Sequence, residues 1–438
     1  MKQKTLLNML FLTAWLYVAG VAGCGHQDYK DATGTQPTLP NPPTPASTTV
    51  YVGIDNPGYY SLTLDDAQNQ FSYVPVTYPA AAKGSQFVKA DGVLNLGSLG
   101  GIPLGLAVEQ PGEAATLRPG DSTAYPVISV AEADCFAITG RQRYVYLALG
   151  PHGGGSVSDG TALNPTYGVF TVSTSTDGKS WTIGDNHGYA MPAIGQPNAS
   201  PTENGTDPLT YAATCASTDS VGTVTSNPAA AFVFPQSSPG TNPTFHFHPN
   251  GLFVEDRTPA QQPANDSSAH YGQVGIAVPN AAVSVSDVSK GSYRGFVAKY
   301  GTSASAHPVA LSGPADGSST LAGGLYSGDD LTQTAGSQYS ITLGKQDTAL
   351  NGLFTGAQLS VFDEYGICPA VAQDVTAGLF IHSGFDVQGR PICLSRGVAI
   401  VSLVQGKYVL YFTSYDASTD ASGVYSSTPL IQFYLYQQ

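Results

Sequence analysis

The chain has 438 residues, of which 42% are hydrophobic and only 11% are charged, so it can bury a core and is not disordered throughout. Its formal net charge of −14 argues against nucleic acid as a partner, because binding to phosphates requires a basic surface. The chain contains 50 glycines and 31 prolines, a composition that predicts many turns and few long helices.

The first residues have the pattern of a secretory signal peptide. Lys2 and Lys4 give a basic start, and residues 6–18 form a mostly apolar stretch. That stretch is shorter than the roughly 20 residues that a membrane-spanning helix needs. Small residues follow at positions 19–23. A basic start, a short apolar segment and a small-residue cleavage site are typical of exported proteins.

The run Val21-Ala22-Gly23-Cys24 resembles a bacterial lipobox, with Val21 in place of the more common leucine. The resemblance implies cleavage after Gly23, a lipid on the Cys24 thiol and acylation of the new amino group by a fatty acid such as palmitate. Two or more acyl chains anchor a protein stably in a membrane. In a Gram-negative host, Gly25 in place of an aspartate implies the outer membrane, with the periplasmic or surface side left open.

Residues 24–49 are predicted to form a lipid-anchored tether behind a signal peptide of residues 1–23. Five prolines lie between positions 37 and 45, among Thr and Asn residues. Such a segment cannot bury enough apolar surface to fold, and its prolines favour an extended conformation. The segment would hold the folded body away from the membrane.

Residues 50–438 are predicted to be all-β. Short β-rich runs bounded by Gly, Pro, Ser and Asn recur, and no stretch of 12 or more residues has a clean helical stripe. In the last run, Ile431, Phe433 and Leu435 alternate with three less apolar positions, which predicts a strand with one buried face. The predicted strands are residues 49–54, 59–64, 71–78, 144–149, 168–172, 231–234, 245–248, 274–278, 293–300, 398–404, 407–413 and 430–436.

Two of the turns predict hairpins. Asp177-Gly178 lies between two β-rich runs, and Gln405-Gly406 separates residues 399–404 from 407–412. Glycine supplies the positive φ angle that tight hairpin turns need. Many short strands with such turns predict antiparallel sandwich or barrel domains, with a β-propeller as the alternative.

A domain boundary is expected within the turn-rich region 190–228, which contains five prolines. This boundary divides the body into an N-terminal β domain of residues 50–225 and a C-terminal β domain of residues 226–438. No internal repeat is visible in the sequence.

Four cysteines remain when Cys24 carries lipid: Cys135, Cys215, Cys368 and Cys393. An even number in an exported protein predicts two disulfides, for which three connectivities are possible. One disulfide per predicted domain would pair Cys135 with Cys215 and Cys368 with Cys393.

The candidate metal ligands centre on one pair of histidines. His246 and His248 are two residues apart on a predicted strand, so they share one face of it. Two imidazoles bind a transition metal only with a further ligand, for which Asp256 and His270 are candidates. Two surface histidines on an amphipathic strand are the alternative, and we predict neither a metal nor another cofactor.

One turn resembles a known motif. Residues 175–181, Ser-Thr-Asp-Gly-Lys-Ser-Trp, resemble the Asp-box turn of sialidase-type β-propellers. The motif occurs once and lacks the residue between the aspartate and the glycine, so a plain hairpin with a packed Trp181 is the alternative. Asp65-Asp66, Asp329-Asp330 and Asp363-Glu364 are paired acids, for which solvated loops are the simplest interpretation.

These patterns predict a lipid-anchored cell-envelope protein that binds a ligand or a protein partner without catalysis. No catalytic residue is assigned, since no nucleophile-elbow or comparable motif is present. An exported hydrolase acting on glycans is the second interpretation, with Asp177 or Asp363 as candidate acids. A structural envelope component is the third. The expected contacts are the membrane, through the N-terminal lipid, and an unidentified ligand or protein.

Overall fold

The computed structural model describes most of the chain from residue 48 onward. The predicted signal peptide, Cys24 and nearly all of the predicted tether lie outside the described residues, so they stay predictions. Residues 1–46 and 47–438 form separate units, and the fold below is that of the second. The described ranges are 48–55, 58–75, 82–86, 88–90, 93–99, 102–110, 114–118, 127–131, 138–151, 163–191, 203–207, 211–217, 230–234, 244–248, 251–256, 272–299, 305–314, 318–327, 332–333, 338–362, 381–385, 391–404, 406–419 and 425–438.

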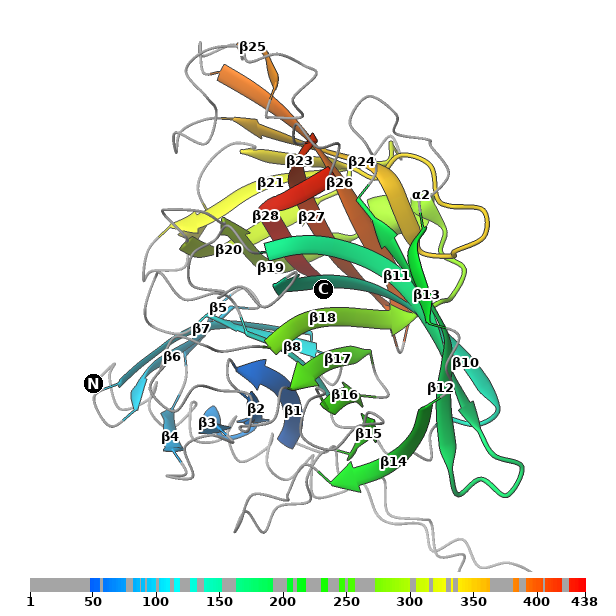
Figure 1. The fold of residues 1–438 in the computed structure, drawn as a ribbon. Coiled ribbons are helices and arrows are strands. Elements are labelled where there is room, and N and C mark those ends of the chain that lie inside the picture. Colours follow the sequence, from blue (N-terminus) through cyan, green and yellow to red (C-terminus); the bar gives the residue numbers. More distant parts are fainter. Residues whose placement is uncertain are drawn as a thin grey trace, which may run out of the picture. The chain divides into compact units, whose positions relative to one another are not determined.

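The first sheet is a nine-stranded antiparallel meander (Figure 1). Its strands are β1 (Thr48–Asp55), β2 (Gly58–Asp65), β3 (Gln70–Pro75), β4 (Ala82–Gln86), β5 (Val88–Ala90), β6 (Val93–Leu99), β7 (Ile102–Gln110), β8 (Ala114–Arg118) and β9 (Val127–Ala131). Their order is β4-β3-β2-β1-β9-β8-β7-β6-β5, so β1 pairs with the last strand, β9. The end strands β4 and β5 are separated by residue 87 alone, so the chain itself joins the two ends of the sheet.

The second sheet is also antiparallel and closes through strand pairing. Its strands are β10 (Arg141–Pro151), β11 (Leu163–Thr174), β12 (Trp181–Ala190), β13 (Glu203–Asp207), β14 (Tyr211–Ser217), β15 (Ala230–Phe234), β16 (Thr244–His248), β17 (Leu252–Asp256) and β18 (Gly272–Pro279). The order is β11-β10-β18-β17-β16-β15-β14-β12-β13, and β11 also pairs with β12. This extra pairing closes every strand but β13 into a ring in which β10 meets β18.

The third sheet is an eight-stranded antiparallel barrel with two additional strands. Its strands are β19 (Ser292–Lys299), β20 (Ser305–Ser312), β21 (Thr320–Ser327), β22 (Thr332–Gln333), β23 (Tyr339–Thr342), β24 (Leu353–Phe362), β25 (Ile381–Phe385), β26 (Pro391–Val404), β27 (Lys407–Thr419) and β28 (Tyr425–Gln437). The path β20-β19-β28-β27-β26-β24-β23-β21 closes because β20 pairs with β21. The strand β22 pairs with β21, and β25 pairs with β26, outside this ring.

The three sheets share one topology that is not visible as a sequence repeat. In each of them the chain runs up and down through neighbouring strands, and the first strand pairs with the last: β1 with β9, β10 with β18 and β19 with β28. In the second and third sheets the additional pairings β11–β12 and β20–β21 close a ring, which removes the exposed sheet edges at which β proteins aggregate. The all-β prediction and its barrel alternative are confirmed. Every predicted strand overlaps an observed strand.

Helix α2 (Val285–Ser289) follows β18 and precedes β19 in the chain, at the transition from the second sheet to the third. Ser284 is its N-cap, and Val288 is fully buried in the same apolar cluster as the barrel interior. The Tyr293 hydroxyl donates a hydrogen bond of 2.9 Å to the Val288 carbonyl oxygen. No helix in the described ranges is long and apolar enough to span a membrane.

Strand β28 differs from its prediction, because both of its faces are buried. Ile431, Phe433 and Leu435 point into the barrel. Tyr434 and Tyr436 are on the outer face, yet they are buried in a second apolar cluster. That cluster joins outward-facing side chains of β19 and β26–β28 to side chains of β10, β11 and β18. The prediction of one buried face was wrong because an alternating pattern does not reveal that another sheet covers the second face.

The predicted domain boundary does not coincide with a change of sheet. Residues 225 and 226 lie between β14 and β15, which pair with each other. The transitions between sheets fall between β9 and β10 and between β18 and β19. Residues 47–438 form one compact unit. A division into domains 50–225 and 226–438 therefore stays a prediction.

Candidate functional site

The hairpin between β11 and β12 contains the turn that resembles an Asp-box. Gly178 has a φ of +70°, as a tight turn requires. The Ser175 hydroxyl donates a hydrogen bond to the Asp177 carboxylate, which also accepts one of 3.1 Å from the Lys179 backbone N–H. These two hydrogen bonds lower the pKa of Asp177. Trp181 is buried. The Asp177 carboxylate accepts hydrogen bonds from residues of its own turn. The motif is therefore explained as a plain hairpin with a packed tryptophan.

A β-bulge in the same hairpin brings four polar residues together. The register between β11 and β12 shifts between Val169 and Thr171, which leaves β12 with one extra residue. Asp185 lies at this bulge with a φ of +55°, a conformation that aspartate tolerates better than most residues. The bulge turns the Asp185 carboxylate towards three partners from β10, β11 and β12.

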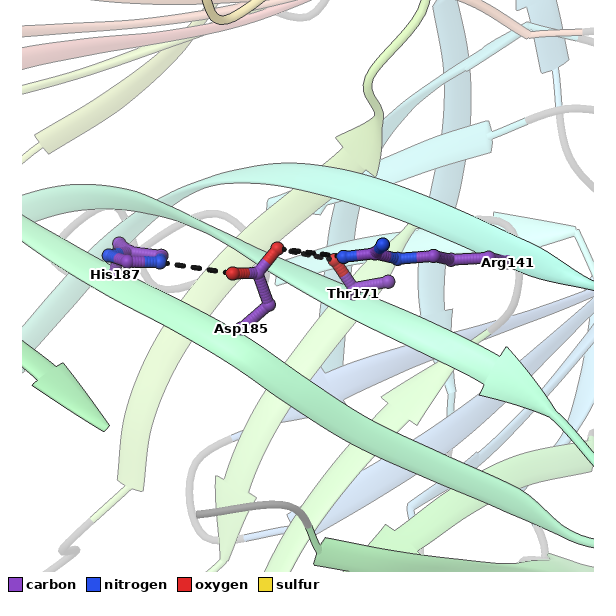
Figure 2. Close-up of polar contacts among 4 residues, drawn as sticks. All are labelled: Arg141, Thr171, Asp185 and His187. Atoms are coloured by element: carbon purple, nitrogen blue, oxygen red, sulfur yellow. Dashed lines mark hydrogen bonds and ion pairs between the residues drawn. The ribbon is translucent and has the colours of Figure 1, made fainter. Parts of the chain in front are cut away.

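Figure 2 shows the contacts of the Asp185 carboxylate with those partners. Its Oδ1 accepts a hydrogen bond from His187 Nε2 at 3.1 Å. Its Oδ2 accepts from the Thr171 hydroxyl at 3.2 Å and from Arg141 NH2 at 3.1 Å. The side chains of Asp185 and His187 are 39% and 28% exposed, and that of Arg141 is 69% exposed, so the cluster reaches the surface. We call these four residues the bulge cluster.

The electrostatics of the bulge cluster favour an ionised carboxylate. Partial burial raises the pKa of Asp185, but the hydrogen bonds from His187 and Thr171 lower it. The positive charge of Arg141 acts in the same direction, and the pKa of Asp185 is lowered overall. The carboxylate therefore holds the three strands together in its charged form.

The bulge cluster contains the three kinds of group that form a catalytic triad, a hydroxyl, an imidazole and a carboxylate, but not in triad order. In a triad the hydroxyl nucleophile bonds to the histidine, which is oriented by the carboxylate. Here the Thr171 hydroxyl donates to the carboxylate instead, and Thr171 is buried. The arrangement suits the bracing of a surface hairpin. Sequence reasoning missed it, although Asp185-Asn186 inside a β-rich run is a turn-forming pair that indicates a bulge.

We expect Asp185→Asn to destabilise the protein at neutral pH but not at low pH. Asparagine tolerates the same positive φ, so the substitution removes charge without adding backbone strain. A carboxyl with a lowered folded-state pKa stabilises above its unfolded-state pKa, and this stabilisation is lost as pH falls through the folded-state value. The loss at pH 7 should be about 1 kcal/mol or less, because the cluster is partly exposed.

Urea unfolding of wild type and Asp185→Asn at pH 7 and at pH 3 measures this difference. Arg141→Gln is the matched control, since it removes one partner but keeps the carboxylate and its two other donors. An equal loss for Asp185→Asn at both pH values would contradict a role for the charged form.

The predicted histidine pair lies on β16, for which the structure describes the backbone but not the side chains. His246 pairs with Val233 and Val254, and His248 pairs with Leu252. Among the side chains that the structure does describe, no group of three or more His, Cys, Asp or Glu could hold a metal ion. Asp256 is at the end of β17 opposite Thr244, and His270 lies outside the described residues.

The cysteines are described in part. Cys393 is buried on the inner face of β26 and is disulfide-bonded. Its proposed partner Cys368 and also Cys135 lie outside the described residues, and Cys215 is on β14 with its side chain not described. The pairings Cys368–Cys393 and Cys135–Cys215 therefore stay predictions.

Of the paired acids, only Asp65 and Asp66 lie within the described ranges. The Asp65 carboxylate accepts hydrogen bonds from the backbone N–H groups of Ala67 and Gln68, at 3.0 and 3.1 Å. It caps the turn between β2 and β3, as the solvated-loop interpretation expects. No sequence pattern indicated a buried acid, yet Glu109 on β7 is buried and accepts a hydrogen bond of 3.2 Å from the Tyr51 hydroxyl.

Comparisons with known proteins add little to this description. No family model matches the chain, and no curated protein matches it. A similar solved structure is that of a double mutant of the vaccine antigen transferrin-binding protein B from Haemophilus parasuis Hp5. The identity is 8%, the match covers 90% of this chain and 67% of that chain, and the TM-score is 0.19. A similarity at this TM-score supports no conclusion about fold or function.

Proposed function

We propose that the chain is a lipid-anchored cell-envelope protein that binds a protein partner through the outer surface of its β body. The resemblance of residues 21–24 to a lipobox and the proline-rich segment behind it support the anchor. The choice of a partner over a small ligand rests on one observation, which is the filled interior of the third barrel.

Eight-stranded barrels have an interior just wide enough for side chains or for one small ligand. In this barrel the space is taken by large side chains that are almost completely buried, among them Tyr293, Phe354, Phe412 and Phe433. Val288 of α2 is fully buried in the same apolar cluster. A barrel filled in this way favours recognition on the outside of the body, which is how proteins bind other proteins.

The anchor is tested with Cys24→Ser in the native host. We expect wild type to sediment with membranes and to be released by detergent, and the variant to lose most of its membrane association. Without the cysteine there is no thiol to receive the lipid. The matched control is Val21→Leu, which introduces the more common lipobox residue and should leave anchoring intact. Sedimentation of Cys24→Ser at the wild-type level would rule out lipid on Cys24 as the anchor.

A further inference from the structure

Arg143, whose buried Nε atom has no acceptor in the described part of the chain, lies where the second sheet meets the third barrel. Arg143 is on β10, on the face that also carries Val145 and Leu147. Those two residues belong to the apolar cluster that the second sheet shares with the barrel. Arg143 is therefore at the rim of a buried contact, and its side chain is half-buried.

The guanidinium of Arg143 has no acceptor among the described residues. Its Nε is fully buried and makes no hydrogen bond, and none of the ion pairs among the described residues includes Arg143. Arg141, two residues earlier on the same strand, differs because Asp185 accepts from it. Buried polar groups in folded proteins are nearly always hydrogen-bonded, so an orphaned donor indicates a water or a ligand.

Asn280 provides an orphaned acceptor directly opposite. Tyr144 pairs with Pro279, and the Asn280 backbone N–H donates to the Arg143 carbonyl oxygen at 2.8 Å, which places Asn280 across from Arg143. The Asn280 Oδ1 atom is fully buried and accepts no hydrogen bond. The third barrel contacts the residue before Asn280, since the Ser402 hydroxyl on β26 donates a hydrogen bond of 2.9 Å to the Pro279 carbonyl oxygen.

We propose that Arg143 and Asn280 bind a carboxylate that has an N–H donor beside it, as the C-terminal residue of a peptide does. The planar guanidinium matches a carboxylate, and the Asn280 Oδ1 atom would accept from the neighbouring peptide N–H. In a chain with 31 acidic and 17 basic residues, a half-buried arginine that no acid of the described segments contacts suits an acidic group from outside. Assigning the carboxylate to a peptide rests on the proposed partner-binding function.

The test follows the Nε–Hε cross-peak of Arg143 by NMR in the full, detergent-extracted chain. The peak is assigned by its absence from the spectrum of Arg143→Lys. The probes are N-acetylglycine, which offers a carboxylate and an adjacent N–H, acetate, which offers the carboxylate alone, and glycolate, which offers a hydroxyl as its donor. We expect a saturable shift, with N-acetylglycine binding about fivefold more tightly than acetate, the usual effect of one hydrogen bond.

Asn280→Ala should lower the affinity for N-acetylglycine to that for acetate, and Arg141→Lys, the matched control on the same strand, should leave both affinities unchanged. No shift with any probe would mean that an ordered water alone occupies the corner, and the proposal would be wrong. Tighter binding of glycolate than of N-acetylglycine would overturn the assignment to a peptide. None of these results depends on the fractionation of Cys24→Ser, so the two proposals fail separately.

Discussion

Gly295→Ala is expected to prevent closure of the third barrel and to cost about 4 kcal/mol or more of unfolding free energy. Gly295 is on β19, the first strand of the barrel, opposite Leu435 on β28, the last. A Cβ atom at this position would lie 1.7 Å from the Tyr434 carbonyl oxygen and 2.8 Å from its carbonyl carbon. Both atoms are backbone, so no side-chain rotation relieves the clash.

Denaturant unfolding followed by far-UV circular dichroism measures this loss. Gly188→Ala on β12 is the matched control. The nearest atom to its new Cβ would be the Tyr146 hydroxyl oxygen at 3.3 Å, at the end of a side chain. We expect the control to lose far less stability than Gly295→Ala. If both variants unfold at the wild-type midpoint, the pairing of β19 with β28 is wrong.

Phe412→Ala is expected to destabilise the protein by about 3–5 kcal/mol, the range for removing a buried aromatic side chain. Phe412 on β27 is 1% exposed. Its ring meets the ring of Phe433 edge to face at a centroid distance of 6.0 Å. A Cβ atom on Gly397 would lie 2.2 Å from the Phe412 ring, so the backbone of β26 passes directly beside it. The truncation therefore leaves a cavity that rigid strands cannot fill.

Leu403→Ala is the control for this cavity, because Leu403 is 43% exposed on the neighbouring strand β26. Its loss should stay within about 0.5 kcal/mol. Calorimetry or urea unfolding of both variants gives the comparison. A small loss for Phe412→Ala would indicate that the interior is loosely packed, and it would remove the main argument against a ligand inside the barrel.

The sequence revealed strands more readily than their pairing. Residues 407–413 and 430–436 are rich in β-branched and aromatic residues, and both were found from local pattern alone. Strand β7 was missed because its segment contains Pro103, Gly105 and Ala107, which are poor strand formers. Ring closure joins β19 to β28, which are more than a hundred residues apart in the chain. No local pattern encodes that contact.

The tyrosines show why burial was harder to predict than strand position. Tyrosines on alternate positions of a strand are compatible with an exposed aromatic face. Here three of them pack together between the barrel and the second sheet: Tyr411, Tyr434 and Tyr436. Burial raises the pKa of Tyr411 well above its ordinary value. Sequence patterns distinguish the two faces of a strand, whereas they do not show which face another sheet covers.

Polar sites, too, could be predicted only where the signal is local in the sequence. The turn at Asp177-Gly178 was predicted because its signal is local. The bulge cluster and the Arg143–Asn280 pair were not, since each joins residues from strands that become neighbours only when the sheet forms. Their members, such as Arg141 and Asp185, lie 44 residues apart in sequence.

The lipid anchor is tested most directly by the intact mass of the mature protein extracted from membranes of its native host. We expect a chain that begins at Cys24 and carries the mass of a lipid on its thiol and of an acyl group on its amino terminus. A membrane-extracted chain that begins elsewhere, or that begins at Cys24 without added lipid mass, would contradict it.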